Sequence, residues 1–379
     1  MKKIVSSCFT PLLAAWVVSM TNALAITTFN ILAPVHRSMP NQPDPDLNLR
    51  ESERQEWWRP RAEAVAQYVA EKFASSDVIL LQEWWFDDYF TKIFDEAISD
   101  TFERVAERRP GSVTGQDRDD GMCCLVRKNG LLELIKSDKV LTGPQRIAQI
   151  IQCRERIPNS GAGGRDVFIA NSHLSFPGDK DHTINSERQA KEAGIILDAL
   201  TRARDTTSSS SESCLEIICG DFNSNSCSAA AALVEDSNFV NCVSATANQL
   251  LTNVGGAVNI GTTHCDHLGN RVSVDHIFLR VSKRKDEKDV HRSVKQERCS
   301  ALALGYLDTQ GTRILAVQRD KILISGSAVL SDHRPVTAKI EWPRLKKTDE
   351  KLSDMYTNVT MPLDPLEPAW GIIQDDDSL

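Results

Sequence analysis

The sequence of 379 residues lacks the short motifs that mark several classes of metalloprotein. It holds ten cysteines but no Cys-x-x-Cys pair, and it has no His-Glu-x-x-His segment. A structural zinc site built on paired cysteines and a zinc protease therefore have no support. No internal repeat is visible. The net charge of −8 excludes a surface coated with basic residues for indiscriminate nucleic-acid binding. A local basic groove or bound cations can still serve a nucleic-acid substrate.

The first 25 residues have the three parts of a secretory signal peptide. Lys2 and Lys3 are followed by an apolar centre over 12–18 and by the small residues Ala23 and Ala25. We expect cleavage after Ala25, which directs the protein into the secretory pathway or outside the cell. An uncleaved membrane anchor is the alternative, because the uncharged span 4–26 is long enough to cross a bilayer.

Residues 26–343 are predicted to form one domain, because no Pro/Gly linker divides them. Short apolar runs alternate with amphipathic segments, which indicates an α/β protein with mixed sheets. Strands are expected at 26–32, 77–85, 102–106, 121–128, 147–155, 166–174, 214–222, 273–280 and within 322–342, and helices at 59–74, 87–98, 185–203 and 226–236. Residues 344–379 are acidic and aperiodic, so we expect a disordered tail. Disulfides are possible, but their pairing is not readable from the sequence.

Ionisable or amide side chains stand beside the ends of the expected buried strands. These are Asn30, Glu83, His173, Asp221 with Asn223, and Asp332 with His333, while Asp275 precedes a strand. If the strand ends meet at one rim, they assemble an oxygen-rich site that suits Mg²⁺ or Mn²⁺. The alternative for Gly220, Asp221 and Asn223 is a simple turn, which these residue types also favour.

The motifs together resemble the endonuclease/exonuclease/phosphatase superfamily, a set of metal-dependent phosphoesterases that includes DNase I-like nucleases. The segments in the expected order are TTFNILAP, LLQE, DGMCCLVRK, NSHL, CGDFNS, VDHIFL and SDHRPV, spanning roughly residues 27–342. Details such as THCDHLGNRVSVDHIF are most similar to the CCR4/nocturnin-like branch of deadenylases and nucleotide 2′-phosphatases. Arg146 departs from that branch, and the signal peptide fits poorly with a cytoplasmic deadenylase. The resemblance implies a four-layer α/β sandwich, with two mixed β-sheets packed face to face and helices outside.

The resemblance also implies roles for individual residues. Glu83 corresponds to the principal metal-binding carboxylate, with Asn30 and Asp332 near or on a Mg²⁺ ion for which Mn²⁺ can substitute. Asp221 corresponds to the residue that orients or deprotonates the attacking water. His333 corresponds to the catalytic histidine, and Asp275 to the carboxylate that fixes its tautomer. His173 and Asn223 correspond to contacts with phosphate oxygens.

Further candidates remain more open. Arg127 is a candidate phosphate contact or an ordinary cation at a strand end. Trp84, beside Trp85, is a candidate for stacking on a base or entering a membrane interface, and partial burial is the alternative. His264 and His267 are interpreted as loop residues near the substrate, with a transition-metal site as the alternative.

The leading hypothesis is a magnesium-dependent hydrolase of phosphodiester bonds, a nuclease of the RNA exonuclease type or a nucleotide phosphatase. A secreted lipid phosphodiesterase of the sphingomyelinase type is the alternative, for which a membrane lipid is the partner. A catalytically silent binding protein is the third possibility, and the complete set of site residues argues against it. We expect a monomer, and the sequence points to no protein partner.

Overall fold

The computed structural model describes residues 23–38, 49–111, 119–156, 164–177, 182–207, 213–242, 263–265, 271–283, 313–319, 324–325 and 328–341. The chain divides into two compact units, Met1–Pro343 and Arg344–Leu379. All the described residues belong to the first unit. The expected acidic tail and most of the expected signal peptide lie outside the described residues.

The first sheet has six strands in the order β13-β16-β1-β2-β4-β3. β1 and β2 are parallel, and the other neighbours are antiparallel. The strands are β1 (Ala23–Asn30), β2 (Val78–Trp85), β3 (Phe102–Arg108), β4 (Asp120–Arg127), β13 (Arg313–Arg319) and β16 (Val336–Glu341). Helices α1 (Gln55–Lys72) and α2 (Asp88–Ile98) cover its outer face. A short 3₁₀ helix, η3 (Glu51–Glu53), precedes α1.

The second sheet also has six strands, in the order β5-β6-β7-β8-β12-β9. Its parallel pair is β7 with β8. The strands are β5 (Leu132–Gly143), β6 (Arg146–Glu155), β7 (Asp166–His173), β8 (Ser213–Asp221), β9 (Val240–Asn241) and β12 (Asp275–Lys283). Helices α3 (His182–Thr206) and α4 (Ala229–Asp236) pack on its outer face. Two small ribbons complete the described elements, β10 (His264–Cys265) with β11 (Arg271–Val272) and β14 (Ile324–Ser325) with β15 (Ala328–Val329).

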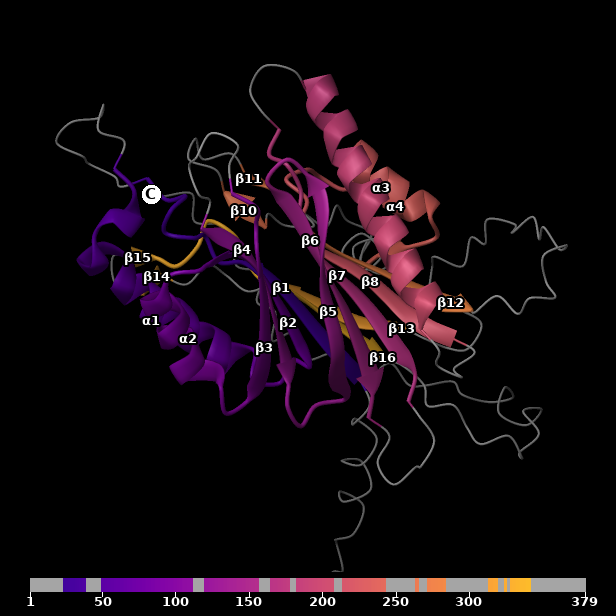
Figure 1. Ribbon diagram of the computed structural model, residues 1–379, viewed down its shortest axis with the longest axis horizontal. Helices are drawn as coiled ribbons and strands as arrows, with labels where there is room; N and C mark the ends of the chain where they lie inside the picture. The colour runs from indigo at the N-terminus through magenta and orange to yellow at the C-terminus, as the bar shows by residue number, and fades with distance from the viewer. Residues whose placement is uncertain are drawn as a thin grey trace, which may run out of the picture. The chain divides into compact units, whose positions relative to one another are not determined.

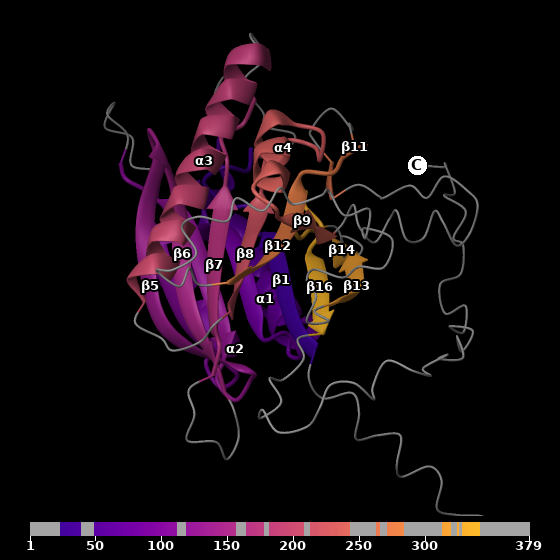
Figure 2. The ribbon, with the colours of Figure 1, turned by 90° about the vertical axis from the view of Figure 1, so that its right-hand side faces the viewer.

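The two sheets pack face to face around a shared apolar core. Alternate residues of β1, β2 and β4 meet alternate residues of β7, β8 and β12, because side chains along a strand point to opposite faces. The core includes Ile26 and Leu80 from the first sheet and Ile169, Ile217 and Ile277 from the second. Figures 1 and 2 show the resulting layers, with α1 and α2 on one side and α3 and α4 on the other. The predicted four-layer α/β sandwich is confirmed.

A buried amide pair links the sheets near the ends of their parallel strands. The Gln82 side chain in β2 donates from Nε2 to Asn171 Oδ1 in β7 at 2.7 Å. Asn171 Nδ2 in turn donates to the carbonyl oxygens of Leu81 and Cys123, each at 3.2 Å. Buried amides are costly unless they are hydrogen-bonded, so these bonds fix how the two sheets face one another at this level.

Three details of the sequence-based prediction are wrong or incomplete. β5 was not predicted, because it is a half-exposed edge strand whose side chains are largely charged or polar. β13 was not predicted either. The helix predicted at 226–236 begins later, because the N-cap of α4 is Ser228, whose side chain accepts a hydrogen bond from the Ala231 amide.

Of the described cysteines, Cys123, Cys124, Cys153, Cys219 and Cys227 are free thiols. Burial raises the pKa of the Cys153 thiol to about 12, so it behaves as a small apolar side chain. None of the helices among the described residues is both long and apolar enough to span a membrane.

β1 begins at Ala23, three residues before the expected mature N-terminus. Ala23, Leu24 and Ala25 pair with β16, and the Ala25 amide donates to Asp77 Oδ2 at 3.0 Å. Leu24 is 1% exposed and belongs to the core between the sheets. Cleavage after Ala25 stays a prediction, and it would remove paired residues from this strand.

We therefore expect a chain that starts at Ile26 to be less stable than one that starts at Ala23. Loss of the buried Leu24 side chain alone should lower the free energy of unfolding by about 2–5 kcal/mol. Urea unfolding of the two chains, followed by circular dichroism, measures the difference. Equal unfolding midpoints would show that β1 does not need residues 23–25.

Candidate active site

The ends of β1, β2, β7 and β8 and the start of β12 meet at one edge of the sandwich. In the second sheet, His173, Asp221 and Asp275 lie side by side, because Asp221 is the direct partner of the other two in the ladder. A pocket of about 640 Å³ opens over this edge. Of the predicted residues, its lining includes Glu83, His173, Asp221, Asn223, Asp332 and His333. The prediction that the polar strand ends converge is confirmed.

Glu83 is turned toward the pocket by an irregularity in β2. Its φ is +59°, a conformation uncommon for a residue with a side chain, and the β2–β4 register shifts between Gln82 and Trp84. Such backbone strain costs about 1–3 kcal/mol and persists only where the surroundings fix it. Here the Ala33 amide donates to Glu83 Oε2 at 3.0 Å, and Asn30 Nδ2 lies 3.3 Å from Oε1.

Asp221 is both part of a turn and the centre of the site. Its Oδ1 accepts a hydrogen bond from the Asn223 amide at 2.8 Å, and Asn223 has φ +50°. Its Oδ2 accepts from Asn30 Nδ2 at 3.0 Å and faces His333 Nε2 at 3.5 Å. The turn therefore aims one carboxylate oxygen at the pocket, so the two interpretations of this segment do not compete.

The environment of Asp221 disfavours its negative charge. Burial is the main cause, and it raises the pKa of Asp221 to about 6, against the charge of His333, which lowers it. Asp275 adds repulsion, while hydrogen bonds from Asn223 and Asn30 favour the carboxylate. A pKa near neutrality is what a general base requires at physiological pH.

His333 and Asp275 form a buried pair. His333 Nδ1 lies 2.9 Å from Asp275 Oδ2, and Asp275 is 0% exposed. Burial alone would lower the pKa of His333, but the charges of Asp275 and Asp221 outweigh it and hold the pKa well above the usual range. The imidazole is therefore oriented by Asp275, as the sequence predicted, and carries a proton toward Asp221.

His173 has the opposite protonation. Burial lowers its pKa well below the usual range, and the nearby Arg146 and Arg109 lower it further. Arg109 Nη2 lies 2.8 Å from His173 Nδ1. Because a guanidinium only donates, Nδ1 must be the acceptor, and the single ring proton sits on Nε2. That Nε2 lies 3.6 Å from Asp221 Oδ2, at the pocket wall.

Arg109 was missed by the sequence analysis. It lies between β3 and β4, is 3% exposed, and pairs through Nε with the buried Asp120 Oδ2 at 3.3 Å. No local motif distinguishes it from the neighbouring Arg108. Its role depends on a contact with His173, 64 positions further along the chain.

Arg61 was also missed, although it lies in the helix that the sequence predicted. Its guanidinium pairs with Glu51 and donates to the carbonyl oxygens of Ile31, Leu32 and Leu330. It therefore fixes the segments that follow Asn30 and precede Asp332. The feature of the sequence that could have identified Arg61 is its place on the apolar side of an amphipathic helix.

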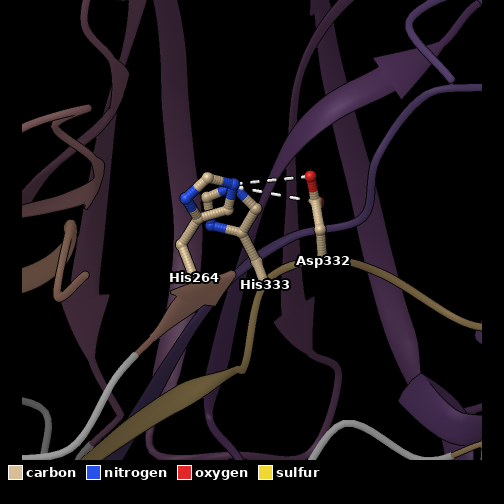
Figure 3. Close-up of side chains that lie close together, drawn as sticks. All are labelled: His264, Asp332 and His333. Atoms are coloured by element: carbon tan, nitrogen blue, oxygen red, sulfur yellow. Dashed lines mark ion pairs between the residues drawn. The ribbon is translucent and has the colours of Figure 1, made fainter. Parts of the chain in front are cut away.

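Asp332 contacts two histidines. His264 Nε2 lies 3.4 Å from Asp332 Oδ2, and His333 Nε2 lies 4.0 Å from Asp332 Oδ1 (Figure 3). Burial raises the pKa of Asp332, but His264 and His333 outweigh it, and the net shift is downward. His264 thus lies at the pocket, in the short strand β10 and not in a loop, and its nearness to a substrate stays a prediction. His267 lies outside the described residues.

Two predicted substrate contacts are wrong. Arg127 lies at the opposite end of the first sheet, where Nη2 pairs with Asp77 Oδ1 at 2.7 Å, because β4 runs antiparallel to β2. Trp84 is 0% exposed and packs against Phe90 and Phe94 under α2. The shift in register that turns Glu83 toward the pocket also turns Trp84 into the core.

A buried acid–base pair beside clustered carboxylates, on a four-layer sandwich, is an arrangement suited to hydrolysis. Residues 27–333 match the profile of the Endonuclease/Exonuclease/phosphatase family. The chain therefore belongs to the Endonuclease/Exonuclease/phosphatase family. Members of this family are phosphoester hydrolases and generally use a divalent metal, so the chain is a phosphoesterase by family. No curated protein matches the sequence.

Solved structures share the fold at low sequence identity. An endonuclease/exonuclease/phosphatase from Bacteroides vulgatus is similar with a TM-score of 0.54 and 14% identity, over 85% of this chain and 100% of that one. The human nocturnin catalytic domain with bound sulfate gives 0.50 and 16%, over 85% and 95%. D. rerio TDP2 complexed with a single-strand DNA product gives 0.50 and 14%, over 84% and 98%.

The raised pKa of Asp221 predicts a variant that is more stable than the wild type. A carboxyl whose folded pKa is raised from 3.8 to about 6 costs no stability below about pH 4 and its full penalty above about pH 6. Without divalent cations at pH 8, the free energy of unfolding of Asp221→Asn should exceed that of the wild type by roughly 1–3 kcal/mol. At pH 4 the two proteins should unfold at the same urea concentration. Exposed Asp198→Asn is the control; a less stable Asp221→Asn at pH 8 would contradict the argument.

Proposed function

We propose that the protein is a magnesium-dependent phosphodiesterase that acts on RNA or a nucleotide by in-line attack of an activated water. The observation that carries this proposal is the position of Asp221. One of its carboxylate oxygens meets Asn30, His173 and His333 at distances of 3.0–3.6 Å, at the wall of an open pocket. A silent binding protein would not need such a costly buried cluster.

The residues present fit a hard divalent cation. Glu83 offers a carboxylate, an oxygen ligand of the kind that suits Mg²⁺. Asn30 turns its Nδ2 toward Glu83 while its Oδ1 accepts from the Leu32 amide at 3.0 Å, so Asn30 positions the carboxylate. The strained backbone at Glu83 is explained if it aims the carboxylate at a cation. A bound Mg²⁺ would neutralise charge on the phosphoryl oxygens. The contacts of Asp332 are with His264 and His333, so we assign Glu83 as the primary Mg²⁺ residue and Asn30 as the residue that positions it.

The remaining residues divide the work of hydrolysis. Asp221, with a pKa of about 6, accepts a proton from the attacking water. His333, oriented by Asp275, presents a positive Nε2–H to the negative charge that develops on the phosphoryl group. His173 presents a neutral Nε2–H from the other side of Asp221, as a hydrogen-bond donor to a phosphate oxygen.

An anionic polymer or nucleotide suits the pocket wall. Besides Arg109 and Arg146, its lining includes Arg37 and Arg50, and arginines favour phosphates through charge and paired donors. Similar solved structures include a TDP2 complex with single-strand DNA product and the nocturnin catalytic domain. These structures support a substrate that contains nucleotides. The nocturnin domain also supports our assignment to the CCR4/nocturnin-like branch. The lipid alternative loses its main argument, because Trp58, Trp84 and Trp85 are buried. We also propose that the protein is secreted through its N-terminal segment and that it is a monomer.

The first test is hydrolysis by the purified chain with Mg²⁺, with Mn²⁺ and with EDTA. Poly(A), mixed RNA, single-stranded DNA, NADP and sphingomyelin form the panel. We expect turnover of RNA or a nucleotide that disappears in EDTA. Asp221→Ala should lower kcat at least about a hundredfold, the scale of general-base catalysis. Glu83→Gln should raise the Mg²⁺ concentration needed for half-maximal rate. Cleavage of sphingomyelin alone would contradict the nucleic-acid assignment.

A second test concerns Arg109 as the residue that positions His173. Arg109→Met removes the donor to Nδ1 and leaves Asp120 buried beside an apolar side chain, so kcat should fall about tenfold to a hundredfold with a smaller change in KM. Arg109→Gln keeps a donor and should recover part of the loss. Combining each Arg109 variant with Asp120→Asn removes the buried carboxylate charge and so separates the loss of kcat from a loss of stability. If Arg109→Met and Arg109→Gln lower kcat equally, the hydrogen bond to His173 does not account for the loss.

A further inference from the structure

Two imidazoles and a carboxylate converge at the pocket rim, outside the Glu83–Asn30 pair. They come from β10 and from the loop between β15 and β16, and Figure 3 shows all three turned toward one another. Their ligand atoms on His264, Asp332 and His333 lie within 4.8 Å of one another. The rings of His264 and His333 are 4.4 Å apart and tilted by only 32°.

The backbone holds this cluster together. His264 and His333 form an isolated antiparallel bridge, and the Arg334 amide donates to the carbonyl oxygen of Thr263 at 2.6 Å. Thr263 Oγ1 in turn accepts from the amides of Val274 and Asp275. The two histidines are therefore placed by hydrogen bonds between segments that are 69 positions apart in the chain.

The spacing and the atoms fit a transition metal better than Mg²⁺. Tetrahedral Zn²⁺ with bonds of about 2.0–2.1 Å requires ligand atoms about 3.3–3.4 Å apart. His264 Nε2 and Asp332 Oδ2 are already 3.4 Å apart, and the His333 Nε2–Asp332 Oδ1 distance is 4.0 Å. Asp332 Oδ1 is a buried acceptor with no hydrogen-bond partner among the described residues.

His333 already has the outer partner that metal-binding histidines usually have. Its Nδ1 lies 2.9 Å from Asp275 Oδ2, which leaves Nε2 facing the pocket between Asp221 Oδ2 at 3.5 Å and Asp332 Oδ1 at 4.0 Å. A carboxylate behind the imidazole fixes the ring and strengthens the other nitrogen as a ligand. The carboxylates of Asp275, Asp221 and Asp332 lie within 2.9–4.0 Å of this ring, and their negative charge attracts a divalent cation.

We propose that His264, Asp332 and His333 form an inhibitory zinc site, with water in the fourth position. Zn²⁺ binds His264 Nε2, the Asp332 carboxylate and His333 Nε2, and the proton on Nε2 leaves to solvent. His333 then has no proton to present to the phosphoryl group, so hydrolysis stops. Zinc binding is independent of the proposed function, whereas inhibition rests on it.

The binding test uses the full chain with millimolar Mg²⁺ present throughout. Zn²⁺ titration by calorimetry should show one site, and Co²⁺ substituted for it should give the visible absorption of a tetrahedral centre. His264→Gln should weaken Zn²⁺ binding at least about a hundredfold, more than loss of an outer partner costs. Asp198→Asn, at an exposed carboxylate outside the pocket lining, should leave binding unchanged. Thermal unfolding checks that both variants fold.

The activity test adds Zn²⁺ to the Mg²⁺-dependent reaction. We expect Zn²⁺ to inhibit the wild type and the Asp198→Asn variant, and the Mg²⁺-dependent turnover that His264→Gln retains to resist Zn²⁺. Zinc bound equally by His264→Gln, or bound without inhibition of an active enzyme, overturns the proposal. Absence of zinc binding in an active enzyme overturns it and leaves the phosphodiesterase intact. Zinc binding that depends on His264, in a chain that hydrolyses nothing in the panel, supports the site and contradicts the proposed function.

Discussion

The active-site edge depends on keeping the Asp221 carboxylate buried. An isolated carboxylate in an apolar interior costs far more than a typical protein's stability, so each neighbour has to reduce that cost. Asn30 and the Asn223 amide supply hydrogen bonds, and His333 supplies a positive charge. The compensation is incomplete, since the pKa of Asp221 stays raised to about 6. A group that is fully stabilised as an anion makes a weak base, and Asp221 avoids this.

The register of the second sheet makes the compensation possible. A slip of one residue would turn a strand's side chains to the opposite face. The pairing of Asp221 with His173 in β7 and with Asp275 in β12 is therefore part of the chemistry. Gly220 permits it, because its φ is +136° and an added Cβ would collide with the backbone of Ser172. The buried Gln82–Asn171 bond then sets the first sheet, with Asn30 and Glu83, against this row.

Most of the fold and much of the site could be predicted because they follow short-range patterns. Buried strands read as apolar runs, and the polar residues at their ends were identified one by one. What could not be predicted depends on long-range or irregular geometry. The bulge in β2 reverses the facing of Trp84, and no alternation rule anticipates it. Arg127 was misplaced because the direction of β4 in the sheet is not encoded in its own residues.

Arg109 explains why two histidines beside one carboxylate do different work. His333 is backed by an acid and His173 by a guanidinium, so the first is held as a cation and the second as a neutral donor. Two cations around Asp221 would lower its pKa and remove its basicity, and two neutral rings would leave its charge unsupported. The residues behind the two histidines therefore adjust the basicity of Asp221, whose raised pKa is caused mainly by burial. Asp120, buried behind Arg109, holds the guanidinium in place and is as much a part of this arrangement as the residues at the pocket wall.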